Sequence, residues 1–567
     1  MPVGVTKGPL PIVVAVTGHV DLRPEDTTAL GNRVRQLFRE LQTKYPHTEL
    51  ELLTPLAEGA DRLAARVALD LGIKLIAVLP MEADEYKKDF ADAASIREFD
   101  ELGAAAAQVF VVPGPAVAGD PRPECYTRVG AFNVQHCHVL MALWNGVATD
   151  KPGGTADIVG FRLQGVPAEY AGFVRLLDPI DTGLVHHIVT PRRSTATTAG
   201  ELFARRLLAP DGDAAVPAAE AALHRICAST DTFNAFAGNT THGVAERRQR
   251  SERDLCGSGL EPARPDLLRI VTLFACADEL AIRFQSHSNR AVKILFALAF
   301  GGIAAFEAYA HLDVPQAVVP YILLSVLAYA LYVWAGSRGL DEKHLDYRAL
   351  AEGLRVQFYW RLAGIRSSAA EYYMRYRLEE SEWIRRALRA CDLFGANTQA
   401  PLNSGAADSR RLGVVITEWV EAQHAFFAKA ERRDQSHLHA LERRASLFAR
   451  LSLLGAAVFV GLSALEHFEL IQLTERQHHA VVVATGVLAA AAAAIHGYAE
   501  KLALGAHIKR YARMKGLFRS ALRILKEKSG DGTDAQTVLL ELGREALEEN
   551  ADWVMLHRDR PLELPTH

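Results

Sequence analysis

Two long apolar runs within residues 291–336 constrain this chain more than any other stretch of its sequence. Only a short turn, residues 311–315, separates them. Each run is about 20 residues long, the length at which a helix crosses a ~30 Å hydrocarbon layer. Within residues 294–310 the single charged residue is Glu307, whereas a core helix normally carries a polar stripe. The sequence therefore predicts a transmembrane helical hairpin. The alternative is a pair of buried helices in a large soluble core.

A second pair of apolar runs, residues 445–465 and 480–499, repeats this arrangement, although the last run is mainly alanine. Basic residues flank both pairs on the side away from the short turns. They are Arg283, Arg290, Lys293, Arg338, Lys343, Arg443, Arg444, Arg450, Lys501, Lys509, Arg510, Arg513 and Lys515. The turns hold almost no Lys or Arg, Arg476 being the exception, and basic residues mark the cytoplasmic side of a membrane. We therefore expect four spans in two hairpins, with both chain termini in the cytoplasm.

The composition fits a soluble part joined to a membrane part. A hydrophobic share of 49% is high for a soluble protein, whereas 23% charged residues is too many for a protein that lies entirely in lipid. A chain of 567 residues suggests three or four units, and a net charge of −4 implies no bulk affinity for nucleic acid. The six cysteines form no CxxC pair, which fits a reducing cytoplasm. The start of the chain lacks the pattern of a signal peptide, so we expect it to stay in the cytosol.

The first 195 residues alternate apolar runs with helical patterns. Strands are predicted at PIVVAVTG, ELELLTPL, KLIAVLP, AQVFVVPG, HVLMALWNG and LVHHIVTPR. The first helix is predicted over residues 27–44, where Leu30, Val34, Leu37 and Leu41 share one face. Such alternation predicts an α/β fold, a doubly wound (Rossmann-like) parallel sheet whose ligand lies across the carboxyl ends of its strands. The fold class is therefore this sheet followed by an all-α part with four transmembrane helices in two hairpins.

Three strand ends lead into loops that are suited to binding phosphate. The first strand breaks at Thr17, Gly18 and His19, the Gly59 turn opens directly into a helix, and the loop at residues 153–155 (GGT) begins another. A helix N-terminus has free backbone N–H groups that attract anions. One such loop alone is more often a simple turn, but three in one domain favour a nucleotide-like ligand.

Four motifs in the first 195 residues resemble those of a known superfamily. The motifs VTGHVDL, PLAEGADRLAARVALDLG, VLPMEADEYKKDF and LWNGVATDKPGGTADIV are similar to those of the SLOG superfamily, which includes relatives of the LOG phosphoribohydrolases and of the DprA fold. The resemblance covers residues 10–195 and implies a nucleotide-sensing domain. The ligand-binding residues that it implies, together with their neighbours at the strand ends, are Thr17, Gly18, His19, Glu58, Gly59, Asp61, Arg62, Pro80, Trp144, Asn145, Gly153, Gly154 and Thr155. Gly18 and His19 would lie beside the base or ribose, and Gly153 to Thr155 would hold the phosphate.

The sequence also departs from that superfamily. Related sequences often have an Arg directly after the Gly-His pair, where this chain has Val20, with Arg23 the nearest substitute. The LOG enzymes use a PGGxGTxxE loop whose Glu takes part in cleavage, but here GGT is followed by Ala156 and Asp157. We therefore expect binding without turnover, with no catalytic residue, no metal site and no cofactor beyond a nucleotide-derived ligand.

Residues 196–265 have no sharp motif and are predicted as a linker with helical pieces. After them, a plan of helix, two spans and helix occurs twice, over residues 266–365 and 441–567, with a helical connector over residues 366–440. ADELAIRFQ, YRALAEGLRVQFYW and ITEWVEAQHAFF resemble the SLATT group of two-span membrane domains, which accompany SLOG genes in bacterial defence islands. The resemblance implies a pore-forming or membrane-disrupting effector; a passive anchor is the alternative.

Together the two resemblances imply a sensor and effector of antiviral or conflict defence in the bacterial inner membrane. A cytosolic domain would bind a nucleotide or an NAD- or ADP-ribose-like signal and would gate the four spans in a homo-oligomer. A membrane-tethered nucleotide hydrolase and a scaffold that only localises a partner remain the other hypotheses. No direct binding of nucleic acid is expected.

Overall fold

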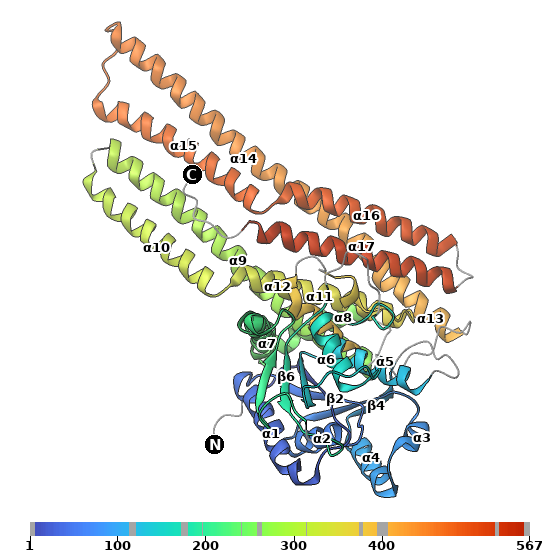
Figure 1. Cartoon of the computed structure of the whole chain (residues 1–567). Helices are drawn as coiled ribbons and strands as arrows, with labels where there is room; N and C mark the ends of the chain where they lie inside the picture. Colours follow the sequence, from blue (N-terminus) through green and yellow to red (C-terminus); the bar gives the residue numbers. More distant parts are fainter. Residues whose placement is uncertain are drawn as a thin grey trace. The chain divides into compact units, whose positions relative to one another are not determined.

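The structure is a computed structural model that describes residues 6–112, 121–171, 180–195, 197–239, 241–257, 264–312, 314–373, 378–393, 406–527 and 532–560 (Figure 1). Its internal contacts divide the chain into two compact units, each built from two separate segments. The first unit comprises Met1–Glu279 and Leu350–Asp408, and the second comprises Leu280–Ala349 and Ser409–His567.

A seven-stranded sheet forms the centre of the first unit. Its strands are β1 (Pro11–Gly18), β2 (Glu49–Thr54), β3 (Lys74–Leu79), β4 (Gln108–Val111), β5 (Val139–Trp144), β6 (Val185–Val189) and β7 (Arg205–Leu208). Their order is β4-β3-β2-β1-β5-β6-β7, and all neighbours are parallel except β6 and β7. This sheet, with the mostly helical carboxyl part, confirms the predicted fold class.

The strands are apolar because helices cover both faces of the sheet. These helices are α1 (Thr27–Lys44), α2 (Ala60–Asp70), α3 (Ala83–Tyr86), α4 (Ala93–Ala105), α5 (Arg122–His136) and α6 (Thr155–Gln164). Val14 packs in one core with Phe38 of α1, whereas Val13 packs in a second core with Val134 of α5 and Ile158 of α6. Successive residues of β1 thus face opposite layers, as the strand geometry requires.

The strand order places a crevice beside β1. The chain runs outward from β1 to β2, β3 and β4, then returns to the other side of β1 with β5. The connections on the two sides of β1 therefore leave in opposite directions above its carboxyl end. Ligands of open α/β sheets bind in such crevices at the point where the strand order reverses. The loops at Gly18 and Gly146 lie at this point, after β1 and β5.

The first unit extends beyond the predicted domain of 195 residues. The stretch predicted as a linker contributes β7, α7 (Val216–Ala237) and α8 (His242–Cys256). After the first hairpin the chain returns with α12 (Leu378–Asp392), where Ala390 joins the core that contains Val13 and Val134. Arg386 of α12 donates to the backbone oxygen of Cys137 at 3.0 Å and pairs with Asp181 at 2.7 Å. This later segment is therefore part of the sheet domain.

The four long apolar helices are α9 (Pro265–His311), α10 (Val318–Ser337), α14 (Ala422–His467) and α15 (Glu475–Lys501). Within the described residues, four helices are long and apolar enough to cross a membrane. The most apolar windows of the third and fourth of these are 0% buried inside the protein. Helices of a soluble core would bury these side chains, so the structure favours membrane-spanning helices over helices buried in a soluble core.

Small residues allow these helices to pack closely within the second unit (Figure 1). A Cβ atom on Gly486 of α15 would lie only 3.1 Å from the carboxylate of Glu307 on α9. The rings of Phe296 and Tyr498 join the same two helices at 5.7 Å. On the other side of α15, the Ser452 hydroxyl of α14 donates to the Thr485 backbone oxygen at 3.1 Å. The two predicted hairpins thus contact each other through α9 and α15.

The other helices of the carboxyl part are α11 (Leu340–Leu362), α13 (Ala406–Val414), a π-helical turn (Val415–Glu421), α16 (Leu504–Glu527) and α17 (Gly532–Arg558). Short 3-10 turns lie at Pro24–Asp26, Lys87–Asp89, Asp213–Ala215, Pro315–Ala317 and Ala369–Glu371. The helical plan occurs twice: α10 continues into α11 through Gly339, and α15 continues into α16 through Ala503. Both linking residues have a left-handed backbone, with φ of 56° and 52°.

Candidate functional site

A cavity of about 540 Å³ lies in the first unit at the carboxyl ends of β1 and β5. Most of the residues predicted from the sequence line it: Thr17, Gly18, His19, Glu58, Asp61, Trp144, Asn145, Gly153, Gly154 and Thr155. Gly59, Arg62 and Pro80 do not line it. The strand-end loops that were identified separately in the sequence therefore surround one space.

Gly18 and Gly59 join the end of β1 to the start of α2. A Cβ atom on Gly18 would lie 2.4 Å from the Ala60 Cβ. Gly59 has φ of 77°, and a Cβ atom there would lie 2.4 Å from the His19 backbone oxygen. The same oxygen accepts a hydrogen bond from the Ala60 N–H at 3.0 Å. These two positions need glycine because the backbones approach too closely for a side chain.

His19 is a neutral histidine at the base of the cavity. Its Nε2 accepts a hydrogen bond from the Asn145 backbone N–H at 2.9 Å, which ties the end of β1 to the end of β5. Burial, with the nearby Arg192 cation, lowers the His19 pKa to about 4. With Nε2 acting as acceptor, the proton of the neutral ring lies on Nδ1. His19 therefore contributes no positive charge to the site at pH 7.

Asp61 lines the cavity from the first turn of α2. Its carboxylate accepts a hydrogen bond from the Ala57 N–H at 3.3 Å. Burial raises the Asp61 pKa to about 8, against the opposing effects of the Ala57 N–H and of Arg62. The side chain is therefore mainly a neutral carboxylic acid at pH 7, able both to donate and to accept a hydrogen bond.

Arg62 and Glu58 organise the segment above the site. The Arg62 Nε donates to the Leu56 backbone oxygen at 3.1 Å, and its Nη1 donates to the Ser95 hydroxyl at 2.7 Å. Its guanidinium also lies 4.4 Å from the centre of the Phe90 ring. Glu58 accepts from the Ala91 N–H at 3.0 Å. Arg62 thus points to α4 rather than into the cavity, which separates it from the other predicted binding residues.

The N-terminus of α6 provides the anion-binding end of the cavity, although not with all of the residues predicted to hold the phosphate. The Gly153 N–H already donates to Asp157 Oδ2 at 2.8 Å, and the Gly154 N–H donates to the Lys151 backbone oxygen at 3.0 Å. Gly154 is the N-cap residue and makes no side-chain cap. The N–H groups of the first helical turn, at Thr155 and Ala156, are therefore the ones left for an anion.

Lys151 is the cation beside this helix end. It lines the cavity and, among the described residues, has no carboxylate partner. The other two cations of the lining are already paired: Arg192 with Asp21 at 2.9 Å, and Arg122 with Asp89 at 2.7 Å. The site thus has one helix N-terminus and one unpaired cation for a negative group.

Two buried polar residues of the lining were not predicted from the sequence. Tyr86 is 1% exposed and Asn133 is 2% exposed. Within the described part of the chain, the Tyr86 hydroxyl and the Asn133 Oδ1 atom have no hydrogen-bond partner. A buried polar atom without a partner costs about 1–3 kcal/mol. Both residues line the cavity.

A helical pattern in the sequence would have revealed one of these residues. Tyr126, Val129, Gly130 and Asn133 all line the cavity, and their i, i+3, i+4, i+7 spacing puts them on one face of α5. Tyr126 donates to the Asp89 carboxylate at the same wall. Tyr86 had no comparable signal, because its place depends on how α3 folds over the sheet.

The arrangement suits the binding of a molecule with a flat ring, neutral polar groups and one anionic group. Phe90, Tyr126 and Trp144 supply aromatic surface, Asp61 and Tyr86 supply neutral polar groups, and α6 supplies the anion site. In the part of the chain that the structure describes, no group of three or more His, Cys, Asp or Glu side chains is placed to hold a metal ion.

Comparison with known proteins yields little. No family model matches the chain. No curated protein matches it either. One solved structure, the X-ray structure of DNA processing protein A (DprA) from Streptococcus pneumoniae, matches at 21% sequence identity with a TM-score of 0.19. The match covers 26% of this chain and 45% of that one, so it spans less than half the length of the DprA protein.

Proposed function

We propose that this protein is a membrane-associated sensor whose first unit binds a nucleotide-derived molecule and whose long apolar helices respond to it. The observation that carries the proposal is the cavity at the reversal of strand order, where buried polar atoms of Tyr86 and Asn133 lack partners beside a helix N-terminus. The volume of about 540 Å³ falls within the range of about 300–1,000 Å³ that small-molecule sites occupy.

The path of the chain supports coupling between ligand and membrane. Helix α9 begins in the first unit and continues without a break into the first hairpin, and α11 leads from that hairpin back into the first unit. A ligand that binds one conformation of the first unit more tightly would shift the population of the attached helices. A tenfold shift requires about 1.4 kcal/mol of differential binding.

As part of the same proposal, the response is a change in membrane permeability by an oligomer of the chain. This is the role that the resemblance to SLATT modules of bacterial defence systems implies. The apolar windows that remain unburied in α14 and α15 offer surface for lipid or for further copies of the chain. A passive anchor would have the same surface, so permeability itself must be measured.

Three measurements on the purified full chain test the proposal. Mass spectrometry should find a nucleotide-derived molecule that copurifies with the protein. Candidates from this class should raise the thermal midpoint, because binding to the folded state alone stabilises it. The same molecule should release a trapped dye from liposomes that contain the protein. Stabilisation without leakage would reduce the proposal to a tethered binding protein, and the absence of any stabilising nucleotide would overturn it.

A nucleotide hydrolase is the second candidate, and Asp61 is the observation in its favour. A buried carboxylic acid that stays protonated at pH 7 can act as a general acid beside a bound ligand. Incubation of the full chain with nucleoside monophosphates, followed by chromatography for free base, separates the two functions. Turnover that disappears in Asp61→Asn would support the enzyme, whereas stabilisation without product supports the sensor.

A further inference from the structure

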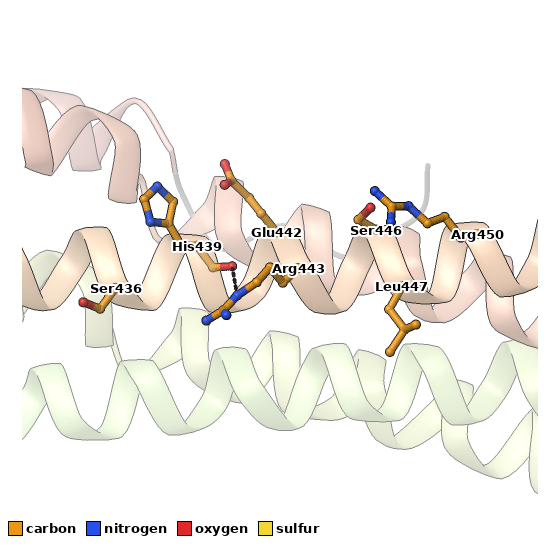
Figure 2. A pocket seen from close by; sticks show the side chains of 7 residues that line it. All are labelled: Ser436, His439, Glu442, Arg443, Ser446, Leu447 and Arg450. Atoms are coloured by element: carbon orange, nitrogen blue, oxygen red, sulfur yellow. Dashed lines mark hydrogen bonds between the residues drawn. The ribbon is translucent and has the colours of Figure 1, made fainter.

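An open groove of about 800 Å³ follows one face of α14 in the second unit. Figure 2 shows the side chains that line it: Ser436, His439, Glu442, Arg443, Ser446, Leu447 and Arg450. Most of them recur every three or four residues, which keeps them on one side of the helix. They come from the stretch that leads into the third apolar run and from the first residues of that run.

The groove lies where α14 changes from polar to apolar. Arg450 is the last charged residue before Glu466, so residues 451–465 carry no charge. Leu447, Leu451 and Leu454 continue the stripe and are 55%, 40% and 60% exposed. The face is therefore cationic at its start and apolar further along the helix.

The two arginines of the groove have no acidic partner among the described residues. The Arg443 Nε donates only to the His439 backbone oxygen of its own helix, at 3.3 Å. Figure 2 shows both guanidinium groups extending toward the N-terminal part of α14. Glu442 is the one acidic side chain among the residues that line the groove. The carboxylate and the two guanidinium groups of the lining together have one net positive charge.

We infer that this groove binds an anionic phospholipid, with the phosphate between Arg443 and Arg450 and an acyl chain on Leu447, Leu451 and Leu454. A phospholipid has the same order of chemistry along its length as this face has along the helix. Arginine is suited to phosphate because its N–H groups can contact two oxygens at once. Basic sites on the cytoplasmic side of membrane helices take anionic head groups in this way. The inference does not depend on the proposed function of the cavity.

Native mass spectrometry of the full chain in detergent tests the inference with phosphatidylglycerol and phosphatidylcholine as probes. The wild-type chain should retain phosphatidylglycerol in preference to the zwitterionic phosphatidylcholine. Arg443→Gln and Arg450→Gln should each weaken the retention of phosphatidylglycerol about fivefold, the effect of one cation near a charged lipid surface. Arg444→Gln is the matched control, because this exposed residue neighbours Arg443 but does not line the groove.

Each outcome decides the inference. Loss in the two groove variants with retention in Arg444→Gln supports a lipid site. An equal loss in Arg444→Gln would show that surface charge alone attracts the lipid, and equal retention of the two lipids by the wild type would show no selection of the head group. Either result overturns the site. A change of oligomeric state in Arg443→Gln, without a change in lipid retention, would assign the groove to a second copy of the chain instead.

Discussion

Tyr86 and Asn133 show how single residues distinguish a binding cavity from a gap in packing. A cavity that is merely imperfect packing is normally apolar, whereas this one has a buried hydroxyl and a buried amide oxygen without partners. Folding leaves these atoms unsatisfied at a cost in stability. They make the lining of this cavity polar, which suits a ligand with hydrogen-bonding groups.

Tyr86→Phe should separate ligand binding from stability. Removal of a hydroxyl that has no partner should leave the thermal midpoint of the ligand-free chain unchanged or slightly raised. The affinity for a ligand that bonds to this hydroxyl should fall by about 1–3 kcal/mol, because the bonding group of the ligand is then left unpaired. Thermal shift with and without the ligand checks both effects. An unchanged ligand-induced shift would remove Tyr86 from the site.

Asp61 should make the stability of the first unit depend on pH. Its folded-state pKa of about 8 lies above the ordinary value of 3.8, so between these values the folded chain holds a proton that the unfolded chain has lost. The stability contributed by the protonated acid is complete below about pH 4 and falls as the pH rises toward 8.

Asp61→Asn should remove this pH dependence, because the amide is neutral at every pH and can still accept from the Ala57 N–H. Near pH 4 the variant and the wild type should be equally stable. At pH 7, about three pH units above the ordinary pKa, the variant should be more stable by at most about 4 kcal/mol. Thermal midpoints of both chains across this range provide the check. Parallel pH profiles would contradict the buried, protonated state.

At the scale of helices, the same break recurs after each hairpin. Gly339 lies between α10 and α11, and Ala503 between α15 and α16, each with a left-handed backbone. This conformation suits glycine, whereas an L-residue adopts it at about 1–2 kcal/mol. The strain at Ala503 persists because Leu504 is held in a buried cluster with Leu441 and Ala499.

Substitutions at these two breaks should change the stability of the second unit in opposite directions. Ala503→Gly should stabilise the second unit by about 0.5–1 kcal/mol, because the released strain exceeds the added freedom of the unfolded chain. Gly339→Ala should destabilise it by about 1 kcal/mol, although the new methyl group has room, with its nearest neighbour 3.5 Å away. Thermal midpoints in one detergent measure both, and changes of equal sign would refute the backbone explanation.

Helix α17 is attached through a pair of histidines. The Nε2 atoms of His507 and His557 lie 3.1 Å apart, and His557 Nδ1 donates to the Trp553 backbone oxygen at 2.9 Å. Asp434 faces the other side of His507 at 3.6 Å. Burial lowers the His557 pKa to about 4. The nearby His507, Arg510 and Lys501 lower it further, whereas the hydrogen bond to Trp553 opposes the shift.

Acidification should therefore loosen α17. Because the His557 pKa is lower in the folded chain, the stability that neutral His557 contributes is complete above pH 6.5 and is lost as the pH falls toward 4. In this range the unfolded chain takes up a proton on the ring before the folded chain does. Hydrogen exchange in α17, corrected for the intrinsic rate, should rise between about pH 7 and pH 5. His557→Gln cannot titrate and should show a smaller rise. Equal rises in both chains would place the pH response elsewhere.

At the scale of the whole molecule, the first unit is interrupted by the first hairpin. Its core includes Ala390 and Leu393, which follow the hairpin by many residues. Glu51 in the middle of β2 lies 3.4 Å from Arg269 of α9, and Asp181 pairs with Arg386 of α12. The sheet domain therefore needs both segments of the chain.

Shortened chains test this organisation. Residues 1–279 alone should be unstable or aggregate, because the side of the sheet that packs on Ala390 would be exposed. Residues 1–279 joined by a flexible linker to residues 350–408 should fold and keep the ligand-induced thermal shift. Circular dichroism and thermal melting compare the two. A stable fragment of residues 1–279 would show that the later segment is not required.

The sequence by itself determined six of the seven strands, the first helix and the four apolar helices. These features are set by local periodicity and by the length of apolar runs, so they can be recognised in a single chain: residues 27–44 were predicted as a helix and form α1. It also located the strand-end glycines, because close approach of two backbones restricts the residue type.

Only the tertiary structure decided which distant segments meet. It added β7 and α12 to the sheet domain, turned Arg62 away from the cavity, and let Asp157 occupy the Gly153 N–H that was expected to hold a phosphate. It also buried Tyr86 and Asn133 without partners. These outcomes depend on packing and hydrogen bonds between residues far apart in the chain, and no local pattern encodes which of several available partners a polar group will bind.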